Sequence, residues 1–199
     1  MNPLKISRER VSFRRVSFEE SQKIVFDNLD MSYVSFIDTD VSRVQFRNVV
    51  WREDIGGYMP YDAILLFLAK SRKYRKRYFK NARKFLLETK EKLSEGIEKI
   101  RSFDDIDLTV HAIVGYGDRF PEKLRELLDD IINTLDQFRS FNVWEEFILS
   151  EISRDQDITL ENVLSVYRYL RENYDYYLKY EGSGKFFIGE METKRLLLK

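Results

Sequence analysis

Apolar side chains recur at every fifth position between residues 24 and 53. One row consists of Phe26, Met31, Phe36, Val41, Phe46 and Trp51, and a second row, two positions before each of these, consists of Ile24, Leu29, Val34, Thr39, Val44 and Val49. A strand repeats about every 2 residues and a helix about every 3.6, so neither element has this period. A fixed period of another length is typical of repeat architectures, in which each unit buries its apolar side against the next. The period therefore predicts a stack of short units in this segment.

The segment resembles the pentapeptide-repeat family. Two further units lie upstream, at Val11 with Phe13 and at Val16 with Phe18. The resemblance implies a right-handed β-helix with one five-residue unit on each of four sides, in which Phe26 stacks under Phe46. These units make only about two coils, fewer than a free-standing solenoid needs, so the helices that follow must cap them. The expected fold class is α+β: a short right-handed pentapeptide β-helix of about two coils, capped by a mainly α-helical domain.

The rest of the chain has helical patterning. Pro60 follows a cluster of turn residues and is placed to open a helix that runs on beyond Leu86, and Pro121 opens another. Thr159 can cap a helix at roughly 159–180, and the glycines of 181–184 predict a tight turn before a closing helix. We expect three domains: a pentapeptide-repeat segment at 1–55, a helical domain with a basic helix at 56–158, and a helical hairpin at 159–199.

This hairpin also resembles a known element, the helix pair that follows the repeats in archaeal and bacterial pentapeptide-repeat proteins. The residues that carry the resemblance are Tyr167, Arg168, Leu170, Gly184, Phe186, Phe187, Glu190, Met191 and Glu192. In many relatives membrane helices come next, as part of an ion channel. The resemblance therefore implies either a soluble version or the cytoplasmic piece of an ion-channel-like membrane protein.

The amino-acid composition excludes several kinds of site and of protein. There is no cysteine, which excludes disulfides and thiolate metal sites and fits a reducing cytoplasm. The 34 basic and 34 acidic residues cancel, so any binding of polyanions must come from local clustering. High charge without cysteine also fits a heat-adapted protein. No apolar run approaches the roughly 20 residues of a membrane-spanning helix, so we expect a cytoplasmic protein, with the inner face of the membrane as the alternative location.

The sharpest charge cluster is the segment 70–84, which contains nine basic residues, with no acid between Ala63 and Leu87. The candidate anion contacts are Arg72, Lys73, Arg75, Lys76, Arg77, Lys80, Arg83 and Lys84. Wound as a helix, these cations are expected to surround most of the cylinder. Such a cluster can bind anionic lipid or, as a weaker alternative, nucleic acid. The plain alternative is a solvated helix face neutralised by the acids that follow it.

We find no assembled catalytic set or metal site in the sequence. His111, the only histidine, lies among apolar residues without a serine nucleophile motif nearby. The Gly115–Gly117 stretch lacks the setting of a dinucleotide loop. The pair Asp155 and Asp157 lacks the glycine and closing glutamate of a calcium loop. We therefore expect no cofactor and no enzyme.

A second stripe on the helix at 159–180, made of Tyr169, Tyr176 and Tyr180, is a candidate partner-facing surface. The first functional hypothesis is a non-catalytic interaction or scaffold protein with a protein partner or self-association. The alternatives are a cytoplasmic regulatory domain of a membrane protein that contacts anionic lipid, and nucleic-acid binding through the basic helix at 70–84.

Overall fold

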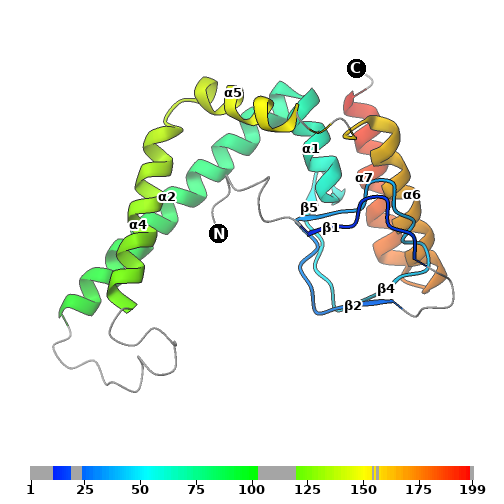
Figure 1. Ribbon diagram of the computed structural model, residues 1–199, viewed down its shortest axis with the longest axis horizontal. Helices are drawn as coiled ribbons and strands as arrows, with labels where there is room; N and C mark the ends of the chain where they lie inside the picture. Colours follow the sequence, from blue (N-terminus) through cyan, green and yellow to red (C-terminus); the bar gives the residue numbers. More distant parts are fainter. Residues whose placement is uncertain (1–10, 19–23, 103–119, 154, 156, 198–199) are drawn as a thin grey trace. The chain divides into compact units, whose positions relative to one another are not determined.

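The computed structural model describes residues 11–18, 24–102, 120–153, 155 and 157–197 (Figure 1). Its strands in chain order are β1 (Val11–Ser12), β2 (Val25–Asp27), β3 (Val34–Ser35), β4 (Gln45–Arg47), β5 (Glu53–Asp54) and β6 (Gly57–Tyr58). Its helices are α1 (Tyr61–Lys70), α2 (Arg72–Ser102), α4 (Phe120–Gln137), α5 (Phe141–Ile152), α6 (Leu160–Tyr176) and α7 (Tyr180–Leu197).

The chain divides into two compact units, which we call the strand unit and the helix unit. The strand unit is built from the described residues within Leu4–Arg75 and Ile148–Lys199, and the helix unit from those within Lys76–Phe147. The boundary between them lies inside α2, after Arg75. The three expected domains, 1–55, 56–158 and 159–199, stay a prediction.

Short parallel strands stack aromatic side chains in the strand unit. β2 pairs with β4 in parallel, with Phe26 opposite Phe46, and the two rings stack with centroids 5.6 Å apart and planes 18° apart. β1 pairs with β3 in the same sense, and Phe13 stacks on Phe36 at 5.8 Å and 11°. The predicted stacking of Phe26 on Phe46 is therefore confirmed.

The fold class expected from that stacking, a pentapeptide-repeat β-helix, is nevertheless wrong. Among the described residues the strands form three separate two-stranded sheets, in the order β1-β3, β2-β4 and β5-β6, and the last pair is antiparallel. A repeat segment only two layers deep offers each short strand a single partner, so no continuous solenoid sheet builds up. The protein is mainly helical with short paired strands.

The two five-residue rows are buried to different extents. From Met31 to Trp51 the first row is at most 5% exposed, as expected of inward-pointing side chains. In the second row Val34, Thr39 and Val44 are buried, but Leu29 is 45% exposed. Leu29 lies beside Val50, whose amide donates to the Leu29 carbonyl at 3.0 Å, and Val50 is exposed as well. The period thus identifies the deep row correctly and overstates the burial of the other.

Helix α1 lies in the core of the strand unit. It begins directly after Pro60, as predicted, and all of its residues from Tyr61 to Leu68 are buried. The expected continuous helix does not form, because Ser71 adopts an extended conformation (φ −119°, ψ 103°) and α2 starts afresh after it. The Arg75 guanidinium donates to the Leu68 carbonyl at 2.8 Å and the Ala69 carbonyl at 3.1 Å, and so caps the end of α1.

The hairpin of α6 and α7 covers one edge of the stacked strands. Side chains at the end of α6 and in the turn donate to main-chain carbonyls of that edge: Asn173 to Val41, Ser42 and Val44, Tyr177 to Arg43, and Lys179 to Phe46. An uncovered edge would offer these carbonyls to another strand. The hairpin therefore closes this edge of the strand layers by satisfying their carbonyl groups.

The hairpin turn lies earlier than its glycines suggest. Thr159 caps α6 as predicted, with its hydroxyl accepting from the Asn162 amide at 3.2 Å. However, α6 ends at Tyr176, and the predicted turn at 181–184 lies within α7. Leu178 takes the left-handed conformation, with φ 57°, that reverses the chain. Gly182 is instead a packing position, because a Cβ there would collide with the Tyr174 ring.

Aromatic side chains form the core of the helix unit. Trp144 of α5 is buried, and it contacts Tyr78 and Phe79 of α2 at centroid distances of 6.0 Å and 5.4 Å. Phe138 packs against Phe147 at 5.1 Å. These contacts turn the aromatic residues of the basic segment inward, away from its cations.

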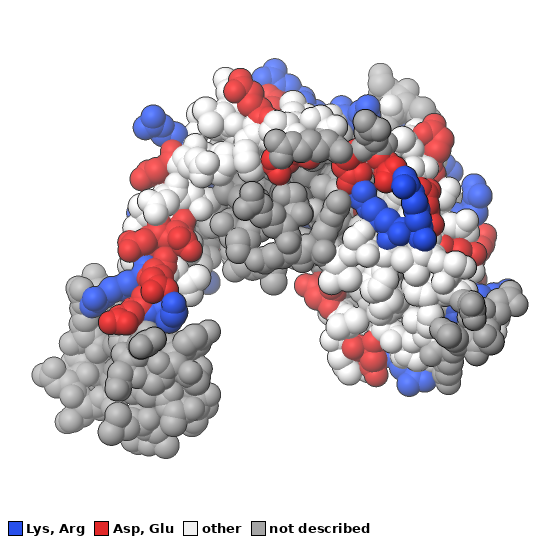
Figure 2. All heavy atoms as spheres, in the orientation of Figure 1, with Lys and Arg blue, Asp and Glu red and all other residues white. Residues whose placement is uncertain are grey.

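Basic and acidic side chains are interspersed over the face of the molecule that Figure 2 shows, in keeping with the equal numbers of the two charges. Within the described part of the chain, no helix combines the length and the apolar character that crossing a bilayer requires.

Candidate functional site

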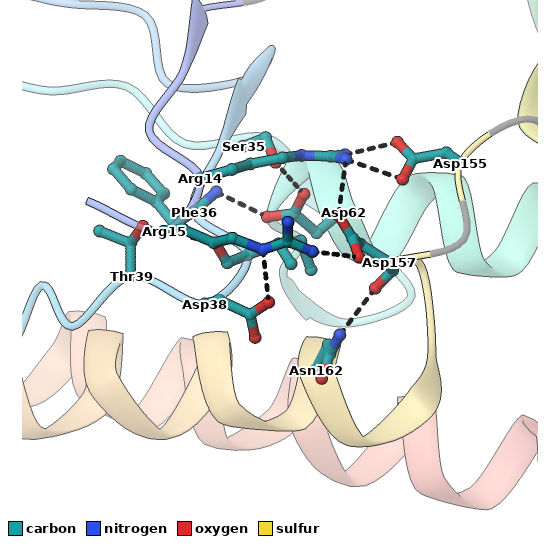
Figure 3. A network of polar contacts seen from close by, with 11 residues as sticks. Arg14, Arg15, Ser35, Phe36, Asp38, Thr39, Asp62, Asp155, Asp157 and Asn162 are labelled. Carbon is teal, nitrogen blue, oxygen red and sulfur yellow. Dashed lines mark hydrogen bonds and ion pairs between the residues drawn. The ribbon is translucent and has the colours of Figure 1, made fainter.

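An arginine–carboxylate network joins distant segments of the strand unit (Figure 3). At its centre is Asp62, in the first turn of α1, which is fully buried. Its carboxylate accepts from the Ser35 hydroxyl at 2.5 Å and from the Phe36 amide at 2.9 Å. A buried carboxylate is tolerated only when donors compensate for its lost hydration, and these two contacts do so.

Arg14 connects this carboxylate to the segment before α6. Its two terminal nitrogens donate to the Asp155 carboxylate at 2.7 Å and 2.6 Å, a bidentate pair, and its Nε donates to the Ser35 hydroxyl at 3.0 Å. Burial acts to lower the pKa of Arg14, but the hydrogen bond to Asp155 and the surrounding carboxylates raise it overall. Arg15 adds an exposed pair to Asp157 at 2.8 Å.

This network has the contacts of a structural clamp. The Ser35 hydroxyl donates to Asp62 while accepting from Arg14, so its proton and its oxygen are both engaged. A serine nucleophile needs a neighbouring base that takes its proton, commonly a histidine that a third group orients. His111 and Gly115–Gly117 lie outside the described residues. The network holds the segments at β1, β3, α1 and the start of α6 together.

The acidic pair Asp155 and Asp157 belongs to the same network. Asp155 and Asp157 both contact arginine side chains. Over the residues that the structure describes, no group of three or more His, Cys, Asp or Glu side chains could hold a metal ion.

A second feature is a hollow of about 560 Å³ in the strand unit, at the turn between α6 and α7. Its lining residues are Asn48, Val49, Tyr58, Tyr174, Leu178, Lys179, Tyr180, Glu181 and Gly182. Its floor is rigid, because the Tyr174 hydroxyl accepts from the Trp51 indole at 2.6 Å and the ring packs on Phe186 at 5.1 Å. Burial raises the pKa of Tyr174 to about 12, so the hydroxyl stays protonated at neutral pH.

Two exposed apolar side chains line this hollow, Leu178 and Tyr180, and together with the hollow we call them the tip patch. Leu178 is 70% exposed and Tyr180 is 65% exposed. Val49 lines the hollow from the strand side, and its chain neighbour Val50 is exposed as well. Exposed apolar side chains gathered at a hollow mark interaction sites more often than isolated exposed residues do.

The predicted partner-facing tyrosines belong to this region in part. Tyr176 is exposed, and the Arg43 guanidinium lies over its ring, 4.4 Å from the ring centroid of Tyr176. Tyr180 lines the hollow. Tyr169 is half-buried on α6. Whether these tyrosines face a partner stays a prediction. Leu178 was missed, because the periodic pattern continues α6 through residue 180 and gives no sign of a left-handed residue there.

The candidate anion contacts separate into one buried arginine and an exposed set. Arg75 is 8% exposed and caps α1, so it is not free to meet a ligand. The exposed members are Arg72, Lys73, Lys76, Arg77, Lys80, Arg83 and Lys84. The expectation that cations surround most of the helix is wrong, because Tyr78 and Phe79 occupy its other side and pack on Trp144.

Comparison with known proteins adds no assignment: no family model, no curated protein and no solved structure matches the chain.

Proposed function

We propose that this protein is a non-catalytic scaffold that acts through protein–protein contact, and that the tip patch is its contact surface. The observation that carries the proposal is the placing of Leu178 and Tyr180, the most exposed apolar side chains at the turn, beside a hollow of about 560 Å³. The Arg14 network supports the same view, because its polar groups bind one another and hold the scaffold together.

The partner that the tip patch fits is a second copy of the chain. A two-fold axis brings the patch of one copy against the same patch of the other copy. Each protruding group must therefore find a complementary group within that same patch. The patch contains a protruding leucine next to a hollow. It also contains a cation and an anion on either side of Tyr180, at Lys179 and Glu181. Two copies related by a two-fold axis can therefore place Leu178 of each copy against the hollow of the other.

The experiment is sedimentation velocity over a concentration series, with a variant that removes the protruding side chain. The wild-type chain of 24.0 kDa is expected to show reversible, concentration-dependent dimer formation, because small interfaces are typically transient. Leu178→Gly is expected to be monomeric and folded, because glycine adopts φ 57° without strain.

The matched control is Asp38→Gly, since Asp38 also has a positive φ of 54° but lies outside the tip patch. This variant is expected to form dimers like the wild type. A wild-type chain that stays monomeric at all concentrations, or dimers that Leu178→Gly leaves intact, would count against the proposal.

A further inference from the structure

The cations of α2 lie along one side of the helix. At about 100° per residue, Lys76, Arg77, Lys80, Arg83 and Lys84 fall within about 120° of its circumference. All five are exposed, and we call them the basic face. The face belongs to the helix unit alone, and it ends where Glu88 follows one turn later, 3.6 Å from the Lys84 amine. An exposed pair of this kind neutralises little of the charge.

The environment of the basic face argues for a flat anionic surface. Tyr78 and Phe79 point away from the face and pack on Trp144, so neither ring is available to stack on unpaired bases. Asparagine and glutamine, the amides that read base edges, are absent from the arc. An apolar side chain follows the cations on the same side of the helix, because Leu87 comes one turn after Arg83 and Lys84, falls within the same arc and is 39% exposed.

Cations followed on the same side by an exposed leucine fit a helix that lies at a membrane interface. The ammonium and guanidinium groups attract anionic headgroups, while the apolar side chain enters the boundary of the acyl region. We propose that the basic face of α2 binds the surface of anionic membranes, with Lys76, Lys80, Arg83 and Lys84 contacting lipid headgroups and Leu87 entering the membrane boundary at the end of the face. This inference goes beyond the proposed self-association and does not depend on it.

The test is co-sedimentation with lipid vesicles. The full chain is expected to bind vesicles with about 30 mol% phosphatidylserine, to ignore pure phosphatidylcholine, and to detach as salt screens the charges. The variant K76Q/K80Q/K84Q is expected to bind at least tenfold more weakly. The variant K92Q/K123Q/R139Q removes the same charge from exposed positions of the same unit outside the arc, and it is expected to bind nearly as well as the wild type.

Two further measurements make the result decisive. Circular dichroism melting shows whether each variant keeps the wild-type fold, because all substituted side chains are exposed. Leu87→Gln is expected to weaken vesicle binding several-fold while leaving any mobility shift of duplex DNA unchanged. The proposal is overturned if the wild type does not bind anionic vesicles, if both triple variants bind equally, or if the basic face shifts DNA but not lipid.

Discussion

Gly189 is the residue at which the backbone of α7 passes closest to the β5-β6 hairpin. A Cβ at this position would collide with the Tyr58 carbonyl and would lie 2.9 Å from the Tyr167 hydroxyl. The Tyr167 hydroxyl donates to the same carbonyl at 3.2 Å, so the three residues form one tight contact. Gly184, five residues earlier on α7, has open space around the same position. Substitutions at these two glycines therefore report two different effects on stability: tight packing at Gly189 and helix propensity at Gly184.

Alanine at these two positions is expected to have opposite effects. Gly189→Ala should lower the free energy of unfolding by about 2–3 kcal/mol, because a backbone carbonyl cannot move aside easily. Gly184→Ala should raise it by about 0.5–1 kcal/mol, because alanine favours the exposed interior of a helix. Urea unfolding of the two variants measures both changes. Equal stabilities would show that α7 does not approach β6 as described.

At the scale of elements, one carboxylate ties the two helices of the hairpin together. Glu190 of α7 accepts from Arg171 of α6 at 2.8 Å and from Lys194 at 2.6 Å. Burial acts to raise the pKa of Glu190, but these two cations lower it overall, below its usual value. The Arg171 guanidinium also lies over the Phe187 ring at 4.9 Å, so the pair is held in place by packing.

The lowered pKa of Glu190 gives the hairpin a pH dependence of definite sign. A carboxylate with a depressed pKa stabilises the folded state above its unfolded pKa, and the effect is lost as the pH falls through the folded value. We expect the wild type to lose stability between about pH 5 and pH 3 more steeply than Glu190→Gln does. Urea midpoints at a series of pH values measure this. Glu172→Gln, at an exposed position of α6, should keep the wild-type slope, and an equally steep loss in Glu190→Gln would contradict the assignment.

Local signals in the sequence predicted several elements well. Pro60 precedes α1 and Thr159 caps α6, because each depends on neighbours within one helical turn. The turn of the hairpin was misplaced, because glycine serves both to reverse a chain and to let helices approach. Gly182 does the second, against a Tyr174 ring eight residues away. A single sequence does not distinguish these two uses.

At the scale of the whole molecule, the resemblance to pentapeptide repeats predicted a contact and not a fold. It implied that Phe26 stacks on Phe46, and the parallel pairing of β2 with β4 confirms this contact. It overstated the architecture, because most of the described chain is helical and two layers of strands do not make a solenoid. The clamp between Arg14 and Asp155 joins residues 141 positions apart, and no periodic pattern reports such a pair. The tip patch was half predicted, through Tyr180 but not Leu178.

The central claim is that two copies of the chain meet at their hairpin turns. Because the chain has no cysteine, a single introduced cysteine can carry a spin label at a chosen position. Tyr180→Cys places the label at the tip patch, and Glu161→Cys places it at the opposite end of α6, about 25 Å along the helix. Double electron–electron resonance should find a short, well-defined distance between the labels at 180 and a longer one between those at 161. No dipolar coupling at 180, or a shorter distance at 161, would contradict the claim.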